Sequence, residues 1–291
     1  AKSRQHQNTK YNWPKQSRHF NFDIWICLEF RNQDLEFGCQ DCRHLPCARN
    51  YKAKSGREVA GHRRYPRFLL YLKLMLTLID SGSITSASGF LAGAVCAGIK
   101  GKDQLDLAIL CSEVPCVAAA VFTTNQIKSA PVVLSQRHVA RGQAQAVVAN
   151  SGCANACVGE QGLAHAAEMA KLTAEKLDIS LERVLVASTG VIGVSLPMDK
   201  IRAAIPKIKP TNEGGHDFCR AVMTTDTSSK EIAVQVDSKE GKFTVGGVAK
   251  GAGMIHPNMA TILCFIATDA VVSADFLPVA LHRAVDGSFN M

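Results

Sequence analysis

The chain changes character near residue 80, and this change limits which part can form a packed core. Residues 1–80 contain 15 Lys and Arg against 7 Asp and Glu, whereas the rest contains 18 of each, so the net charge of +8 lies entirely in the first part. The Trp and Tyr residues also lie there, at Trp13, Trp25, Tyr11, Tyr51, Tyr65 and Tyr71. The later part is rich in Ala, Val and Gly. Its neutrality argues against a nucleic-acid partner.

The segment 1–74 is predicted to be a basic, irregular N-terminal region outside the folded domain. It shows no sustained period of 2 or 3.6 residues, and the chain begins with Ala1. Met75 opens a short Leu/Ile run that leads into the Ala/Gly-rich part, so we expect the domain at 75–291 and a natural start near Met75. Segment 1–74 should then be dispensable for the chemistry. The apolar run Leu69–Ile79 is too short to span a membrane, and Lys73 interrupts it.

Cysteine usage is typical of reduced intracellular thiols. The chain has 11 Cys, an odd number, and seven of them lie among small apolar residues at Cys96, Cys111, Cys116, Cys153, Cys157, Cys219 and Cys264. We therefore expect a cytoplasmic protein without a disulfide framework. Cys39, Cys42, His44 and Cys47 are close together, but no second ligand pair follows, so we predict no metal site.

Short apolar runs alternate with amphipathic segments in the later part, which predicts a mixed α/β or α+β fold. Expected strands are Leu105–Cys111, Cys116–Thr123, Ala144–Ala149, Arg183–Ala187 and Thr261–Thr268, with a hairpin formed by Glu231–Val236 and Phe243–Val248. Expected helices are Glu160–Leu177, Leu196–Ile205, His216–Thr224 and one that Ser273 caps and that runs to Val285. Ser112–Pro115 should be a turn, and Asn150–Asn155 a loop of small residues.

The densest segment is Lys250–Leu263, where small residues follow a Lys and a Pro precedes an apolar strand. Thr261 stands at the expected start of that strand, directly after Ala260. A Thr in this position is ordinarily only a β-branched strand residue, and Lys250 alone would be an ordinary solvated loop side chain. The residue pattern by itself therefore does not assign a reaction.

Five stretches occur together in one order, at Gly89–Gly93 with Gly98–Lys100, Asn150–Ala156, Ser188–Gly193, Met223–Thr227 and Lys250–Leu263. From Gly89 to Asn290 the chain thereby resembles the ornithine acetyltransferase family, the bifunctional glutamate N-acetyltransferases of arginine biosynthesis. Cys153 departs from an Asn, and Ile262 from a common Met, in the family's pattern. The resemblance implies a layered sheet-and-helix fold of the self-processing, N-terminal-nucleophile-like type.

The resemblance also implies roles for individual residues. The precursor would cleave itself between Ala260 and Thr261, and Thr261 would become the N-terminal nucleophile of a second chain. Thr189 and Gly190 match the oxyanion-hole pair, and Thr227, Lys250 and Thr261 match substrate-binding positions. Acetyl would pass from N2-acetylornithine to Thr261 and then to glutamate. A free α-amine has a pKa of about 7.7–8.0, so the amine of Thr261 could accept the proton of its own hydroxyl.

The same resemblance carries expectations about the whole protein. The family assembles as a heterotetramer of two α and two β chains, needs no cofactor, and includes some members that also accept acetyl-CoA. Its second chain is several times longer than the part after Ala260 here, so we expect a truncated chain of doubtful activity. The competing interpretations are a self-processing aminopeptidase or amide hydrolase, in which water accepts the acyl group, and a binding module with a basic N-terminal arm.

Overall fold

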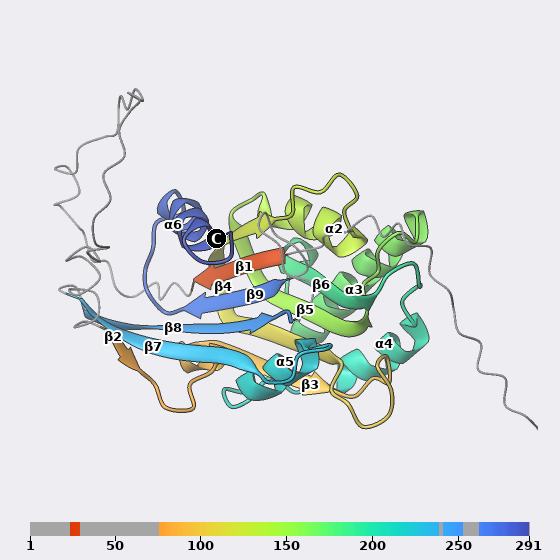
Figure 1. Cartoon of the computed structure of the whole chain (residues 1–291), viewed down its shortest axis with the longest axis horizontal. Helices are drawn as coiled ribbons and strands as arrows, with labels where there is room; N and C mark the ends of the chain where they lie inside the picture. The colour runs from red at the N-terminus through yellow and green to blue at the C-terminus, as the bar shows by residue number, and fades with distance from the viewer. Residues whose placement is uncertain (1–23, 30–75, 239–240, 253–261, 291) are drawn as a thin grey trace, which may run out of the picture.

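One mixed β-sheet forms the centre of the part that the structure, a computed structural model, describes, namely residues 24–29, 76–238, 241–252 and 262–290 (Figure 1). Its strands are β1 Ile24–Glu29, β2 Leu76–Leu78, β3 Phe90–Val95, β4 Leu107–Phe122, β5 Gln143–Cys153, β6 Val184–Val191, β7 Lys230–Ser238, β8 Gly241–Lys250 and β9 Leu263–Thr268. They lie in the order β2-β7-β8-β9-β1-β4-β5-β6, and β3 pairs with β4. The β1–β9 and β5–β6 pairs are parallel, and the other pairs are antiparallel.

Helices cover both faces of the sheet. They are α2 Ala130–Val139, α3 Glu160–Leu177, α4 Met198–Ala204, α5 Gly215–Val222 and α6 Phe276–Asp286, with short 3₁₀ turns at Ile84–Ser86, Leu181–Arg183 and Ile205–Lys207. Successive side chains of β9 point to opposite faces of the sheet. Phe265 packs against Phe218 of α5 on one face, and Cys264 packs in the cluster that contains α6 on the other. Figure 1 accordingly shows α5 and α6 on opposite sides of the sheet. Helices α3 and α4 supply a third cluster around Ile109.

The mixed fold class and several elements are confirmed. Helix α3 has the expected bounds, and β7 and β8 form the expected hairpin. The separate strands predicted around Ser112–Pro115 are wrong: β4 is one strand whose register with β5 shifts between Cys111 and Cys116. The cap prediction for the last helix is also wrong, since α6 begins at Phe276 and its N-cap is Asp275.

The N-terminal segment is not wholly outside the fold. Strand β1 pairs with both β4 and β9, so the prediction that residues 1–74 stand apart is wrong for these six residues. Other residues of that segment, including Cys39, Cys42, His44 and Cys47, lie outside the described residues. Within the described residues, Cys96, Cys111, Cys153, Cys157 and Cys219 carry thiols that form no disulfide. In the described part of the chain, no helix combines the length and apolarity needed to cross a bilayer.

Candidate active site

The carboxyl ends of the parallel strands β5 and β6 meet in a buried polar layer. Ser188 of β6 donates to Asn150 Oδ1 over 2.6 Å, and Asn150 Nδ2 donates to the carbonyl of Cys153 over 2.9 Å. Ser151 donates to the carbonyl of Ala221 at the end of α5. The segment Asn150–Asn155, which was expected to be a loop, is mostly strand, because β5 runs to Cys153. Its polar side chains are hydrogen-bonded to β5, β6 and α5. This network fixes the two strand ends relative to each other.

Thr189 and Gly190, the predicted oxyanion-hole pair, lie at the end of β6 against β5. Gly190 has φ +130, a conformation that favours glycine, and a Cβ there would lie 2.3 Å from the carbonyl carbon of Gly152. Gly152 itself has φ +102 and packs against the backbone nitrogen of Lys100. The backbone therefore approaches its neighbours closely at both glycines, and Gly152 together with Thr189 and Gly190 is called the glycine corner below.

Lys250 reaches this corner from the other end of the sheet. Its side chain is buried, with only 4% of the residue exposed, and its Nζ donates to Thr189 Oγ1 over 3.1 Å. Lys250 ends β8 and pairs in register with Leu263 of β9. The buried Ile262 precedes Leu263 and is covalently joined to Thr261. The structure thus brings two predicted site residues, Lys250 and Thr189, into direct contact, whereas Ala260 and Thr261 lie outside the described residues.

Thr227, the remaining predicted substrate-binding residue, is exposed in the connection between α5 and β7. The preceding Asp226 is not: its side chain is 1% exposed and accepts a hydrogen bond from Gly251 N over 2.8 Å. Burial alone would raise the pKa of Asp226, but hydrogen bonds from Lys230, Gly251 and Thr224 and the charge of Lys250 together lower it to about 2. Asp226 is therefore a carboxylate across the neutral pH range.

Lys100 supplies a second lysine near the same connection. Its Nζ donates to the carbonyl of Met223 over 2.9 Å, and burial lowers the pKa of this ammonium against the attraction of Asp106 and Asp226. Asp106 is fully buried and accepts hydrogen bonds from the backbone nitrogens of Ala97, Ile99 and Lys100. These bonds hold the Gly98–Lys100 stretch against Gly152 and thereby against the Thr189–Gly190 corner.

Asp226 and Lys100 are site residues that our sequence reasoning did not single out, although both lie inside matched stretches. The departure at Cys153 falls in the layer below the corner: its thiol is buried, donates to the carbonyl of Val194, and has a pKa raised by burial. Burial and the raised pKa both favour the neutral thiol form of Cys153. Among the described residues no group of three or more His, Cys, Asp and Glu is placed to hold a metal ion.

Comparisons with known proteins identify the family to which the chain is similar. The model of the ArgJ family matches residues 91–291. The arginine biosynthesis bifunctional protein ArgJ of Dehalococcoides mccartyi is 54% identical over 222 residues, which are 76% of this chain and 55% of the relative. The protein of the same name from Symbiobacterium thermophilum is 54% identical over 217 residues, which are 72% of this chain and 54% of the relative. The chain therefore spans about half the length of these relatives.

Two solved structures share the fold. The arginine biosynthesis bifunctional protein ArgJ of Bacillus halodurans has a TM-score of 0.61 and 46% identity, covering 64% of this chain and 98% of that one. The ornithine acetyltransferase of Mycobacterium tuberculosis, solved with ornithine, has a TM-score of 0.59 and 40% identity, covering 64% of this chain and all of that one. With a family model that matches more than half of its residues, the chain belongs to the ArgJ family.

Proposed function

We propose that the complete protein transfers acetyl from N2-acetylornithine to glutamate through an ester on Thr261, after cleavage of the Ala260–Thr261 bond. The observation that carries this proposal is the buried contact between Lys250 Nζ and Thr189 Oγ1 beside the glycine corner. Family membership supports it, as does the solved ornithine acetyltransferase of Mycobacterium tuberculosis, which is complexed with ornithine. Cyclic arginine biosynthesis would be its metabolic context.

Cleavage would require no other reactant than water. The Thr261 hydroxyl attacks the carbonyl carbon of Ala260, the C–N bond breaks, and the hydroxyl proton passes to the leaving amine. Water then hydrolyses the resulting ester, which leaves a carboxylate on Ala260 and a free hydroxyl and amine on Thr261. Ile262 and Leu263 are buried next to Lys250, so the new N-terminus would begin at the site.

Transfer would then follow two similar steps. The Thr261 amine takes the hydroxyl proton while the oxygen attacks the acetyl carbonyl, and ornithine leaves with that proton. The amine of glutamate attacks the ester in turn and restores the hydroxyl. Each tetrahedral intermediate carries an oxyanion, and a lost donor in such a hole costs roughly 100- to 1000-fold in rate. Thr189 and Gly190 would supply that stabilisation.

The charged and exposed residues would bind the two substrates. Lys250 and Thr227 would contact the substrate, and the buried ammonium suits a carboxylate, which both N2-acetylornithine and glutamate carry. The protein would act in the cytoplasm as a heterotetramer of two α and two β chains, without a cofactor. Acetyl-CoA would be tested as an additional acetyl donor in the same assay.

A chimera provides the test. We define the extended chain as residues 1–290 joined to the part of the Dehalococcoides mccartyi relative that follows its matched region. We expect it to yield two fragments, the second beginning with Thr261 by Edman sequencing, and to transfer acetyl from N2-acetylornithine to glutamate. Thr261→Ala should abolish both reactions because the hydroxyl is gone, and Thr261→Ser should retain part of each.

Two outcomes would reject this proposal. Transfer at the reference rate by Thr261→Ala would remove the nucleophile assignment. Release of acetate from N2-acetylornithine, with no acetylglutamate formed, would replace the transferase by an amide hydrolase.

A further inference from the structure

A buried carboxylate beside the site has no part in the chemistry described above. Asp226 lies in the connection between α5 and β7, and its side chain is almost completely shielded from solvent, at 1% exposed. A charge in such a place is costly unless it is paired and hydrogen-bonded. Its partners therefore indicate what the chain gains from keeping it there.

The partners of Asp226 come from three places in the sequence. Oδ1 accepts from Gly251 N over 2.8 Å and from Lys230 Nζ over 2.7 Å, and Oδ2 accepts from Thr224 N over 3.2 Å. Gly251 directly follows Lys250, the residue that contacts Thr189. One carboxylate thus connects its own loop, the start of β7 and the end of β8.

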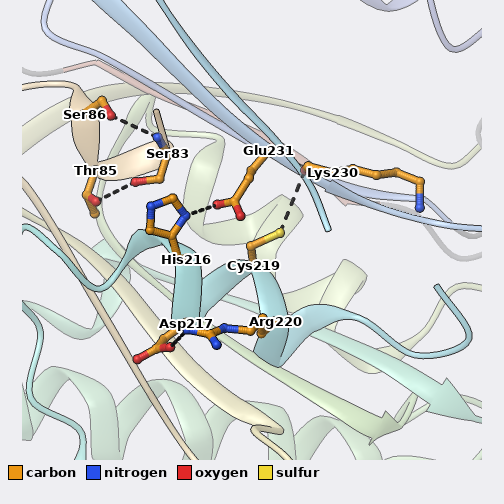
Figure 2. Close-up of polar contacts among 9 residues, drawn as sticks. All are labelled: Ser83, Thr85, Ser86, His216, Asp217, Cys219, Arg220, Lys230 and Glu231. Carbon is orange, nitrogen blue, oxygen red and sulfur yellow. Dashed lines mark hydrogen bonds and ion pairs between the residues drawn. The ribbon is translucent and has the colours of Figure 1, made fainter. Parts of the chain in front are cut away.

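The loop that carries Asp226 is anchored at its base. Figure 2 shows His216 of α5 against Glu231 of β7, with Nδ1 and Oε2 separated by 2.9 Å. Cys219 of the same helix donates to the carbonyl of Lys230. These two contacts join α5 to β7 across the base of the loop that carries Asp226. They therefore limit the movement of Asp226 relative to Gly251.

Positive charge surrounds the carboxylate. The ammonium groups of Lys250 and Lys230 lower its pKa, and the charge of Asp226 in turn favours the protonated form of Lys100. Burial, followed by the charge of Glu231, raises the pKa of the nearby Cys219 thiol to about 11, and the charge of Asp226 adds to this effect. The carboxylate therefore both fixes a backbone position and stabilises the charge on the lysines.

We propose that Asp226 is a positioning residue for the acyl chemistry: it fixes the Lys250–Gly251 junction so that the Lys250 side chain stays directed at Thr189. This inference rests on the proposed function and adds a role that acts through Lys250. A misplacement of about 1 Å at a reacting group can cost about 100-fold in rate, so loss of this tether should affect cleavage and transfer strongly.

The test compares Asp226→Asn with Asp217→Asn in the extended chain. Asp217 is a matched control because it is an ion-paired carboxylate on α5, bonded to Arg220, but is 45% exposed and far less enclosed. We expect Asp226→Asn to slow cleavage and transfer by roughly 10- to 100-fold and Asp217→Asn to behave like the reference. Equal rates in the two variants would overturn the proposal.

The pH profile of transfer separates positioning from mere folding. Without the carboxylate the Lys250 ammonium loses a stabilising charge, so the alkaline limb of kcat/KM should move to lower pH in Asp226→Asn. A variant with a lowered melting temperature, lowered activity and an unshifted profile would show a structural role only and would overturn the proposal. If Asp226→Asn did not fold, Asp226→Glu would be measured, with the same slowing expected because its charge is displaced by one methylene.

One readout is independent of activity. Hydrogen exchange of the Gly251 amide, measured in the 291-residue chain, should be faster in Asp226→Asn than in Asp217→Asn, because the bond to Oδ1 becomes weaker. Unchanged exchange would overturn the tether even if the extended chain proved inactive. Inactivity of the reference extended chain would instead count against the proposed function alone.

Discussion

Gly190 is the residue at which backbone conformation and close packing coincide. Its φ of +130 and the 2.3 Å that would separate a Cβ from the Gly152 carbonyl carbon leave no room for a side chain. Gly193 is a matched control, because its φ is +79 but nothing lies within 4 Å of a Cβ. Comparing the two positions separates conformational strain from steric overlap.

We expect Gly190→Ala to cost about 3 kcal/mol or more of unfolding free energy, since strain and overlap add, and Gly193→Ala about 1 kcal/mol. In the extended chain, Gly190→Ala should also lower transfer by about 100-fold or more, as for a lost oxyanion donor. Urea unfolding and initial rates provide the measurements. Similar losses of stability in the two variants would show that the corner tolerates a side chain.

The candidate site could be predicted from the sequence only as a set of matched positions. Lys250 and Thr189 were named because their motifs were recognised, but the pattern gave no reason to pair residues 61 positions apart. Asp226 lies between two Thr residues, and this local pattern does not distinguish a buried carboxylate from one in an exposed turn. Its importance depends on contact with Gly251, which only the fold creates.

Strand β6 illustrates what pattern reading captures and misses among the elements. Its apolar run was expected at Arg183–Ala187, and the strand continues through the polar Ser188 and Thr189 to Val191. The Ser188 side chain is hydrogen-bonded to Asn150 inside the sheet. Helix α2 was not predicted at all. It covers the open edge of β6, where Ser135 Oγ both donates to Val186 O and accepts from Val186 N, each over 2.8 Å. An element whose role is to cover an edge carries little periodic signal of its own.

We expect Ser135→Ala to destabilise the protein by about 1–3 kcal/mol, because two buried backbone groups of Val186 lose their partner. Ser180→Ala is the control, since Ser180 is exposed and its hydroxyl donates to the Glu182 carboxylate. Denaturant unfolding would measure the free energy of unfolding of both variants, with one common dependence on denaturant concentration (m-value). A change below about 0.5 kcal/mol in Ser135→Ala would mean that Val186 finds other partners.

At the scale of the whole molecule, the sheet joins residues from both parts of the chain that composition separates. Charge and aromatic content divide the sequence near residue 80, yet β1, which precedes that division, pairs within the sheet. Six residues with a basic, aromatic surrounding give no distinct strand pattern. These residues pair with β4 on one side and β9 on the other, two strands that are far apart in the sequence. Local sequence patterns do not reveal such long-range pairing.

Strand β1 makes the N-terminal segment testable by two deletions. Removing residues 1–74 takes β1 from between β4 and β9 and leaves backbone groups of both strands without their sheet partners, which costs free energy where they are buried. We expect that deletion to lower the melting temperature by more than about 5 °C, given a shift of roughly 2–4 °C per kcal/mol at this size. Removing residues 1–23 keeps β1 and should leave the melting temperature nearly unchanged. If the chain starting at Met75 had the same melting temperature as the 24–291 chain, the prediction of a dispensable segment would stand. Strands β4 and β9 would then have to be stabilised without β1.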